Sequence, residues 1–192
     1  MENGNLSSKD SLKWENLAVF ALSHLGLSRE QFLDFYPDPV LIRERKKGIP
    51  ISKLLKEKKA QKMVIPLEKL ELQGVPAGLS DVKNRENEFI FLPFGQKNRI
   101  WIGRSSECEV VLNFPWVALR HASIHKEGEG WYKIEDLGAE GGTILNGVKL
   151  MAGIGYPIGD FGQLIFGKGI RYFFLTPNGF FNYLSLFEEG GD

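Results

Sequence analysis

The sequence predicts a mainly β fold, an antiparallel β-sandwich with helices before it and one short helix after it. Short apolar runs rich in β-branched and aromatic residues recur about every ten residues between residues 99 and 147, separated by Gly, Pro or Asn. Helical spacing of apolar residues is found only towards the two ends of the chain. With 43% hydrophobic and 12% aromatic residues over 192 positions, the chain can build one large domain or two small ones.

Residues 1–87 are predicted to form an N-terminal region of helices and extended segments. Residues 8–26 favour a helix, because their apolar side chains fall close to helical periodicity and Gly26 suits the position after a helix end. Ser28 is expected to cap a second helix, with Gln31 as the partner in a capping box. The sequence therefore places two helices ahead of the sandwich.

The second helix is predicted to stop at Tyr36, because Pro37 and Pro39 enforce an extended exit. Residues 40–42 then favour a short strand or buried extension. Further along, an extended segment at 63–67 and a loop at 73–87 are expected to lead into the sandwich.

Residues 43–62 form a basic connector, with nine Lys or Arg residues against two Glu residues. One interpretation is a solvated link with a helical turn or two. The other is a docking patch for an acidic partner or a nucleic acid. The connector contains no aromatic residue, which argues against a platform for stacked bases.

The sandwich itself is predicted over residues 88–176. Strands are expected at residues 89–92, 100–102, 110–112, 121–125, 131–137, 149–151, 163–167 and 170–175. A turn is expected at residues 96–98, and Gly-Lys-Gly at 167–169 is a strong hairpin signal. These features outline one continuous β domain.

Residues 177–192 are predicted to form a C-terminal helix that packs on the domain. Thr176 can cap this helix and Pro177 suits its first position. The apolar residues Phe180, Phe181, Leu184 and Phe187 fall on one face. That face is expected to be buried against the sandwich or the N-terminal helices.

Charge and composition exclude several classes of partner. Lys plus Arg equals Asp plus Glu at 24 each, which argues against a nucleic-acid or membrane partner. No apolar run approaches the roughly 18 residues of a spanning helix, and the polar stretch after Met1 lacks the features of a secretory signal. Cys108 is the single cysteine, so no internal disulfide can form. A cytoplasmic protein is therefore predicted, with Cys108 as a small residue in or beside a strand.

Enzyme chemistry finds no support in the sequence. His121 and His125 are four residues apart, but on the predicted strand that spacing separates them by about 13 Å, too far to share a metal ion. Glu135 and Asp136 are neighbours on a strand and point to opposite faces, so they do not form an acid–base pair. The sequence predicts a protein that is not an enzyme, with no cofactor, no metal and no small-molecule substrate.

Four short motifs occur in a specific order within the β region. They are Gly103-Arg104-Ser105, Leu119-Arg120-His121-Ala122, Gly142-Thr143 and Asn146-Gly147. In this order and spacing the chain resembles a forkhead-associated (FHA) domain, as a divergent bacterial-type member, over about residues 88–176. The resemblance implies an FHA-like sandwich whose loops at one rim hold a phosphothreonine peptide. The expected partner is then a threonine-phosphorylated protein, in a signalling role.

The resemblance assigns roles to individual residues. Arg104 matches the arginine that contacts the phosphate, and a phosphate with about −1.5 to −2 charges suits a guanidinium fork. The phosphopeptide-binding candidates are Arg104, Ser105, Arg120, Thr143 and Asn146. The structural candidates are Gly103, His121 and Gly147.

Several contact positions depart from the family pattern. Ala118 stands where the family has a phosphate-binding serine, and Leu119 where a basic or amide side chain is common. Gly141 replaces an asparagine that holds the peptide backbone, and Glu140 precedes it. Losing two or three charged hydrogen bonds costs roughly 3–9 kcal/mol of binding free energy.

Two functions follow from these departures. One is weak or atypical phosphothreonine-peptide binding. The alternative is a phosphate-independent scaffold that docks through the hydrophobic loop 114–119 or through the basic connector 43–62.

Overall fold

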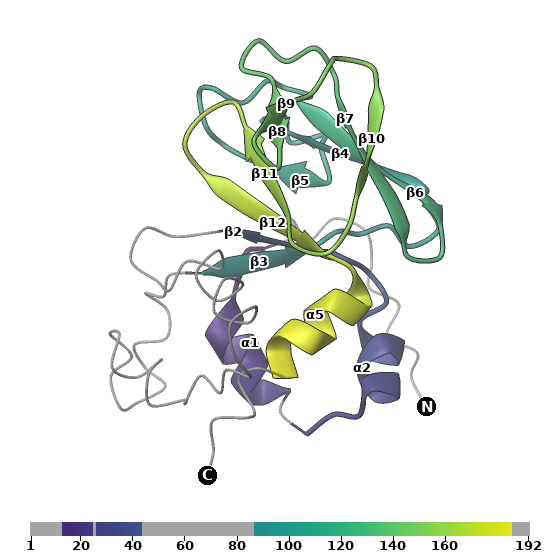
Figure 1. The fold of residues 1–192 in the computed structure, drawn as a ribbon. Coiled ribbons are helices and arrows are strands. Elements are labelled where there is room, and N and C mark those ends of the chain that lie inside the picture. Colours follow the sequence, from purple (N-terminus) through teal and green to yellow (C-terminus); the bar gives the residue numbers. More distant parts are fainter. Residues whose placement is uncertain (1–12, 25, 44–86, 186–192) are drawn as a thin grey trace.

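The computed structural model describes residues 13–24, 26–43 and 87–185, which form a β-sandwich with three helices packed on one side (Figure 1). One sheet has seven strands and the other has five. The predicted mainly β sandwich with flanking helices is confirmed. No helix among these residues combines the length and the apolar character needed to cross a bilayer.

The five-stranded sheet carries the first two of the four motifs. Its strands, in spatial order, are β10 (Gly155–Ile158), β7 (Trp131–Asp136), β6 (Ala122–Gly128), β4 (Arg99–Gly103) and β5 (Val110–Val111). All neighbours run antiparallel except β4 and β5, which are parallel. Because β4 and β5 run the same way, the chain must cross back between them through a loop, and that loop carries Arg104.

The seven-stranded sheet joins distant parts of the chain. Its order is β1 (Glu15–Asn16), β3 (Glu88–Phe91), β2 (Val40–Arg43), β12 (Arg171–Leu175), β11 (Gly162–Phe166), β8 (Thr143–Leu145) and β9 (Val148–Lys149). The hairpin between β11 and β12 turns through Gly167 and Gly169, both with positive φ, as their sequence indicates. The expected strand at 149–151 is shorter, since β9 ends at Lys149 and Met151 is exposed.

Strand β2 corrects the expected division of the chain. The sequence assigns residues 40–43 to the region before the sandwich, whereas the structure places them inside the larger sheet, between β3 and β12. Leu41 faces the core between the sheets, and Val40 and Ile42 face the helices. A strand covered on both faces has a continuous apolar run, which gives no hint of its distant partners. The sandwich of this structure therefore does not begin at residue 88.

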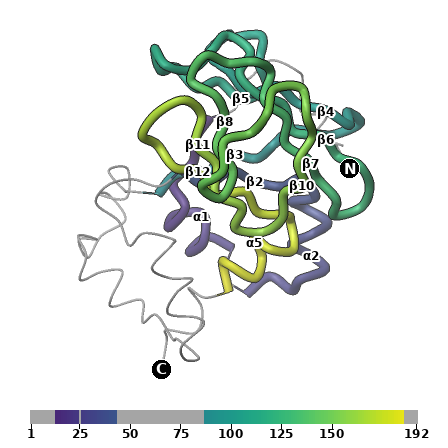
Figure 2. The backbone as a smooth tube through the Cα atoms, turned by 45° about the horizontal axis from the view of Figure 1, so that its top comes forward, coloured from purple at the N-terminus to yellow at the C-terminus, as the bar shows by residue number. Residues whose placement is uncertain are grey.

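Three helices cover the outer face of the seven-stranded sheet (Figures 1 and 2). They are α1 (Leu17–Ser23), α2 (Arg29–Phe35) and α5 (Pro177–Leu184). A second core forms there, in which the rings of Phe20, Phe89 and Phe180 lie within 5.6 Å of one another, centroid to centroid. The helices therefore bury a sheet face that would otherwise be apolar and exposed.

The start of α1 differs from the sequence prediction. The helix begins at Leu17 with Asn16 as its cap, whereas the apolar spacing predicts a start at Ser8. Residues 15 and 16 instead pair with β3, and the Leu17 N–H donates to the Asn87 carbonyl at 3.1 Å. These pairings use the backbone groups that a longer helix would need. Residues 1–12 lie outside the described ranges.

The other helix signals are confirmed. Ser28 and Gln31 form the reciprocal capping box of α2, and Tyr36 is the residue that caps the end of this helix. Thr176 caps α5, Pro177 is at its start, and Phe180 and Leu184 are buried. Phe187, most of the basic connector 43–62, and the segments 63–67 and 73–86 lie outside the described residues.

We expect Phe180→Ala to lower the free energy of unfolding by about 3–5 kcal/mol, because its ring is completely buried among aromatic neighbours in the second core. Urea denaturation followed by fluorescence measures this. Phe35→Ala is the matched control, since Phe35 lies on α2 with 67% of its surface exposed. Equal effects of the two substitutions would mean that the helices are not packed on the sheet.

Candidate functional site

The candidate site is one end of the sandwich where four loops meet, called here the loop end. Its segments are residues 104–109 after β4, 112–121 before β6, 137–142 between β7 and β8, and 167–170 between β11 and β12. Backbone hydrogen bonds connect them, from Arg104 N–H to the Ala118 carbonyl at 2.9 Å and from Gly167 N–H to the Gly142 carbonyl at 2.9 Å. The motifs at 103–105, 119–122 and 142–143, which are far apart in the sequence, therefore come together in space.

The first two loops are packed backbone against backbone. Arg104 and Ser105 donate their N–H groups to the carbonyls of Ala118 and Leu119, at 2.9 and 3.0 Å. A Cβ atom on Gly103 would lie 2.8 Å from the carbonyl carbon of Leu119, closer than real side chains come. Glycine at 103 therefore allows the approach that sets the direction of Arg104.

His121 bridges two of the loops from a fully buried position. Its Nδ1 accepts the Ala118 N–H at 3.1 Å, so Nε2 holds the ring proton and donates to the Gly142 carbonyl at 3.0 Å. Burial lowers the pKa of His121, against the hydrogen bond to Gly142 and the nearby charge of Asp136. The neutral ring thus links residues 118 and 142; we call this pair of hydrogen bonds the His121 bridge.

Thr143 faces inward, away from solvent. Its hydroxyl donates to the Asp136 carboxylate at 2.6 Å, and the other Asp136 oxygen accepts the Gly138 N–H at 2.9 Å. Both Thr143 and Asp136 are buried. Glu135, which directly precedes Asp136 on β7, lies on the opposite face of the sheet, as strand alternation predicts. Thr143 therefore shapes the turn 137–142 and presents no group to a ligand.

Asn146 and Gly147 lie at the far end of β8 from the loop end. Both have positive φ, 51° and 85°, and they form the turn between β8 and β9. The Asn146 side chain accepts the Gln163 N–H at 2.9 Å, and its own N–H donates to the Gln163 carbonyl at 2.8 Å. The structure does not bring Asn146 together with Arg104.

Arg104 is the exposed cation of the first loop. Within the part of the chain that the structure describes, its guanidinium has no hydrogen-bond or ion-pair partner. Ser105 beside it accepts the Glu107 N–H through its hydroxyl at 3.2 Å. The side chain of Arg104 is therefore available to a ligand, whereas that of Ser105 already accepts one bond.

Arg120 points elsewhere. Its guanidinium pairs with Glu107 at 3.2 Å and lies 5.2 Å from the centre of the Trp101 ring. The side chain of Arg99, from the outer face of the five-stranded sheet, lies over the same ring. Arg120 is thus directed towards that outer face and is neutralised there by Glu107.

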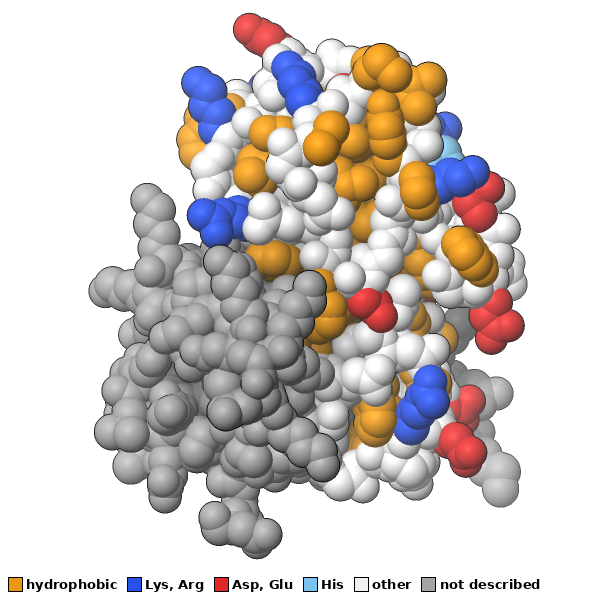
Figure 3. All heavy atoms as spheres, viewed as in Figure 1, with side chains coloured by type: hydrophobic (Ala, Val, Ile, Leu, Met, Phe, Trp, Pro, Cys, Tyr) orange, Lys and Arg blue, Asp and Glu red, His pale blue; other side chains and the backbone are white. Residues whose placement is uncertain are grey.

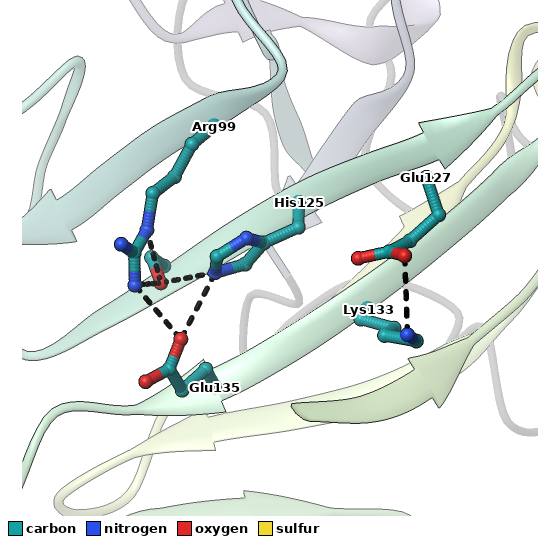
Figure 4. Close-up of polar contacts among 6 residues, drawn as sticks. Arg99, His125, Glu127, Lys133 and Glu135 are labelled. Carbon is teal, nitrogen blue, oxygen red and sulfur yellow. Dashed lines mark hydrogen bonds and ion pairs between the residues drawn. The ribbon is translucent and has the colours of Figure 1, made fainter. Parts of the chain in front are cut away.

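The outer face of the five-stranded sheet holds a polar network that is closed on itself (Figure 4). Arg99 and His125 both contact the Glu135 carboxylate, at 2.8 and 3.0 Å. The buried Ser123 hydroxyl lies within hydrogen-bond distance of Arg99 and His125. The His125 ring thus contacts Ser123 and Glu135, whereas the His121 ring contacts the backbone of Ala118 and Gly142. The two histidines share no partner among these contacts.

Cys108 is buried under the loop after β4, where its thiol donates to the Leu119 carbonyl at 3.2 Å. Burial raises the pKa of Cys108, and the nearby Glu109 and Glu107 act in the same direction, while Arg120 opposes them. The thiol therefore stays protonated. It serves as a small packing group beside a strand.

The hydrophobic loop 114–119 divides between core and surface. Val117 is buried in the core between the sheets, and Phe114 is half-buried against that core. Trp116 stacks on Phe114 with ring centres 5.1 Å apart and is 37% exposed. Leu119 is 61% exposed. Of the four apolar residues expected to form a docking surface, Trp116 and Leu119 are thus the exposed ones, Phe114 is half-buried and Val117 is buried.

Gly141 is in close contact with the turn between β11 and β12. A Cβ atom on Gly141 would lie 2.7 Å from the Cα of Gly167 and 3.4 Å from the Trp116 carbonyl oxygen. An asparagine at this position would collide with backbone. By resemblance to the family, Gly141 lacks the asparagine side chain that would hold a peptide backbone. In the structure, glycine at this position allows the turn at Gly167 to pack closely.

Sequence reasoning did not single out Lys149. Its stem lies against Gly142, and a Cβ atom on that glycine would come within 3.2 Å of the Lys149 ammonium nitrogen. No local sequence pattern predicts this contact, because it forms only when the edge strand β9 lies beside the turn 137–142.

Comparisons with known proteins agree with the motif order. Residues 100–167 match the model of the FHA domain family. FhaB, an FHA domain-containing protein of Mycolicibacterium smegmatis and of Mycobacterium tuberculosis, is 37% identical over 60 residues. That stretch spans 31% of this chain and 38% of those relatives. The FHA domain structure of the CT664 protein from Chlamydia trachomatis is 19% identical, with a TM-score of 0.42, over 48% of this chain and 87% of that one.

We expect Gly141→Ala to destabilise the protein by about 1–3 kcal/mol, because the added methyl group meets the Gly167 backbone. Gly128→Ala is the control, since a Cβ at Gly128 meets nothing within 4 Å. Chemical denaturation of both variants provides the comparison. A Gly141→Ala variant as stable as the wild type would show that the two turns separate easily.

We expect His121 to make the protein less stable in mild acid. The folded-state pKa of His121 lies below its unfolded value of about 6.5, so neither state is protonated well above that pH. As the pH falls through about 6.5, the unfolded chain takes up the proton first, and stability is lost until the folded-state pKa is reached.

Melting curves between about pH 7.5 and pH 5.5 measure this effect. The comparison is with His121→Gln, which retains His24 and His125 but lacks this titration. The wild type is expected to lose more stability over the interval than the variant does. An equal loss in both proteins would show that His121 does not titrate differently on folding.

Proposed function

We propose that this chain, a member of the FHA domain family, is a non-catalytic protein-recognition module that binds threonine-phosphorylated segments of partner proteins at its loop end. The observation that carries the proposal is Arg104. Its guanidinium is exposed and has no hydrogen-bond or ion-pair partner among the described residues, and the Ala118 and Leu119 carbonyls fix the backbone at 104 and 105. We propose that the module serves signalling or assembly in the cytoplasm.

A phosphothreonine requires positive charge and hydrogen-bond donors on a rigid frame. Its three phosphate oxygens accept strong bonds from a guanidinium fork and from backbone N–H groups. Among the described groups, no acceptor takes the N–H of Glu140 or of Gly141, and both residues are exposed at the loop end. The guanidinium of Arg104 and the N–H groups of Glu140 and Gly141 are therefore the donors proposed to bind the phosphate oxygens.

The binding is proposed to be weak. Ala118 and Gly141 offer no side-chain donor, Leu119 is apolar, and Glu140 adds a negative charge near the rim. Each missing charged hydrogen bond lowers the binding free energy by about 1.5–3 kcal/mol. Arg120 does not replace them, because Glu107 and Trp101 hold it on the outer sheet face.

The partner is proposed to be a different protein. This chain contains two threonines, Thr143 and Thr176. Thr143 is fully buried and bonded to Asp136, and the Thr176 hydroxyl accepts the Gly179 N–H at the start of α5. Both hydroxyl groups are used by the fold, so a second copy of this chain is a poor source of the phosphothreonine.

We expect Arg104→Ala to weaken binding of a phosphothreonine peptide by about 10- to 150-fold, the equivalent of one charged hydrogen-bond contact. Calorimetry with peptides drawn from a degenerate phosphothreonine library measures the change. Lys133→Ala is the control, since Lys133 pairs with Glu127 on the far outer face (Figure 4). Equal binding of phosphorylated and unphosphorylated peptides would contradict the proposal and favour the apolar surface of Trp116 and Leu119.

We expect the double substitution Ala118→Ser and Leu119→Arg to strengthen phosphopeptide binding, because each change returns a donor beside Arg104. The gain is expected to disappear when Arg104→Ala is added and to be absent for unphosphorylated peptides. Gly141 is left unchanged, because an asparagine there would meet the Gly167 backbone. A double variant that binds no better than the wild type would show that the loop presents these positions away from the ligand.

A further inference from the structure

We propose that Lys149 determines specificity at the loop end by selecting a partner segment with an acidic residue beside its phosphothreonine. This inference rests on the proposed function and assigns a further role within it. It starts from the place of one side chain in the structure, outside the four motifs.

Lys149 is placed over the centre of the loop end. It pairs with Ile144 across β8 and β9, and the next residue, Leu150, donates its N–H to the Thr143 carbonyl at 2.9 Å. These pairings fix the backbone. The side chain then lies against Gly142, with its ammonium nitrogen 3.2 Å from where a Cβ of Gly142 would stand.

Gly142 connects Lys149 to the opposite side of the site. Its carbonyl accepts the His121 bridge, whose other end is Ala118, and the Ala118 carbonyl accepts the Arg104 N–H. The backbone N–H of Arg104 is therefore at one end of a short chain of hydrogen bonds, and the Lys149 side chain packs against Gly142 at the other end. A bound segment that reaches Arg104 with its phosphate extends over this chain towards Lys149.

The charges at the loop end favour an acidic segment. In the described part of the protein the Lys149 ammonium has no hydrogen-bond or ion-pair partner, and it is exposed. Lys168 is also exposed, in the turn whose Gly167 donates to Gly142. The exposed acid on these turns is Glu140. Figure 3 shows basic side chains and an acidic one over this end of the sandwich.

The same charges act against basic segments. A Lys or Arg beside the phosphothreonine would approach Lys149 and Arg104 with like charge, and such repulsion contributes to specificity as much as attraction does. An acidic residue beside the phosphothreonine would instead be attracted by the charges of both Lys149 and Arg104. An exposed ion pair is worth up to about 1 kcal/mol, so a preference of about two- to five-fold is expected.

The test uses phosphothreonine peptides that differ only by Asp or Asn at each flanking position. The full chain is titrated with each peptide, as wild type, Lys149→Met, Lys149→Arg and the control Lys133→Met. Methionine keeps an apolar stem over Gly142 and removes the charge, and melting curves of all variants check that the fold is retained. The wild type is expected to prefer Asp by about two- to five-fold at one or more positions, less at high salt.

Loss of the Asp preference in Lys149→Met, with retention in Lys149→Arg and Lys133→Met, supports the assignment. A preference that survives in Lys149→Met, or no preference in the wild type, overturns it. These results do not test the proposed function itself. That proposal fails if the affinity is the same for phosphorylated and unphosphorylated peptides and is unchanged by Arg104→Ala. In that case the specificity assignment fails with it.

Discussion

The loop end depends on the carbonyl group of Gly142. Two donors from different parts of the chain converge on it, the His121 ring at 3.0 Å and the Gly167 N–H at 2.9 Å. The first donor ties the turn 137–142 to the loop before β6, and the second ties it to the hairpin of β11 and β12. A buried histidine suits this role only when neutral, and burial itself lowers the pKa of His121 and keeps it so. One hydrogen-bonded centre therefore fixes the relative positions of loops that are distant in sequence.

Around this centre, polar groups divide into those that the fold uses and those it leaves free. Thr143 is bonded to Asp136, and Arg120 is paired with Glu107, so both serve the structure. Arg104 and Lys149 have no such partner among the described residues. Unpaired cations on a rigid frame cost little while exposed and gain when an anion arrives. The residues proposed to bind a ligand thus differ from the structural ones in that no described group already bonds or pairs with their polar side chains.

The sequence was a good guide to local structure and a poorer one to distant contacts. The capping box of Ser28 and the glycine hairpin at 167–169 follow from short-range chemistry, and both were predicted correctly. Strand β2 was placed outside the sandwich, because a run of buried apolar residues does not reveal which strands flank it. Lys149 was missed for the same reason, since its contact with Gly142 arises only when an edge strand returns beside the turn.

Gly141 shows how packing and binding chemistry constrain each other. The family pattern has an asparagine here, but in this chain the turn at Gly167 approaches so closely that a Cβ at 141 would lie 2.7 Å from its Cα. Trp116 takes part in the same contact through its backbone oxygen. The three loops therefore gain a tight backbone junction at the position where a side-chain donor would stand. Recognition at such a site must depend more on charge and on backbone N–H groups, and less on side-chain amides. Charge acts over several ångströms and is screened by salt, so the proposed binding would depend less on exact side-chain geometry and more on ionic strength.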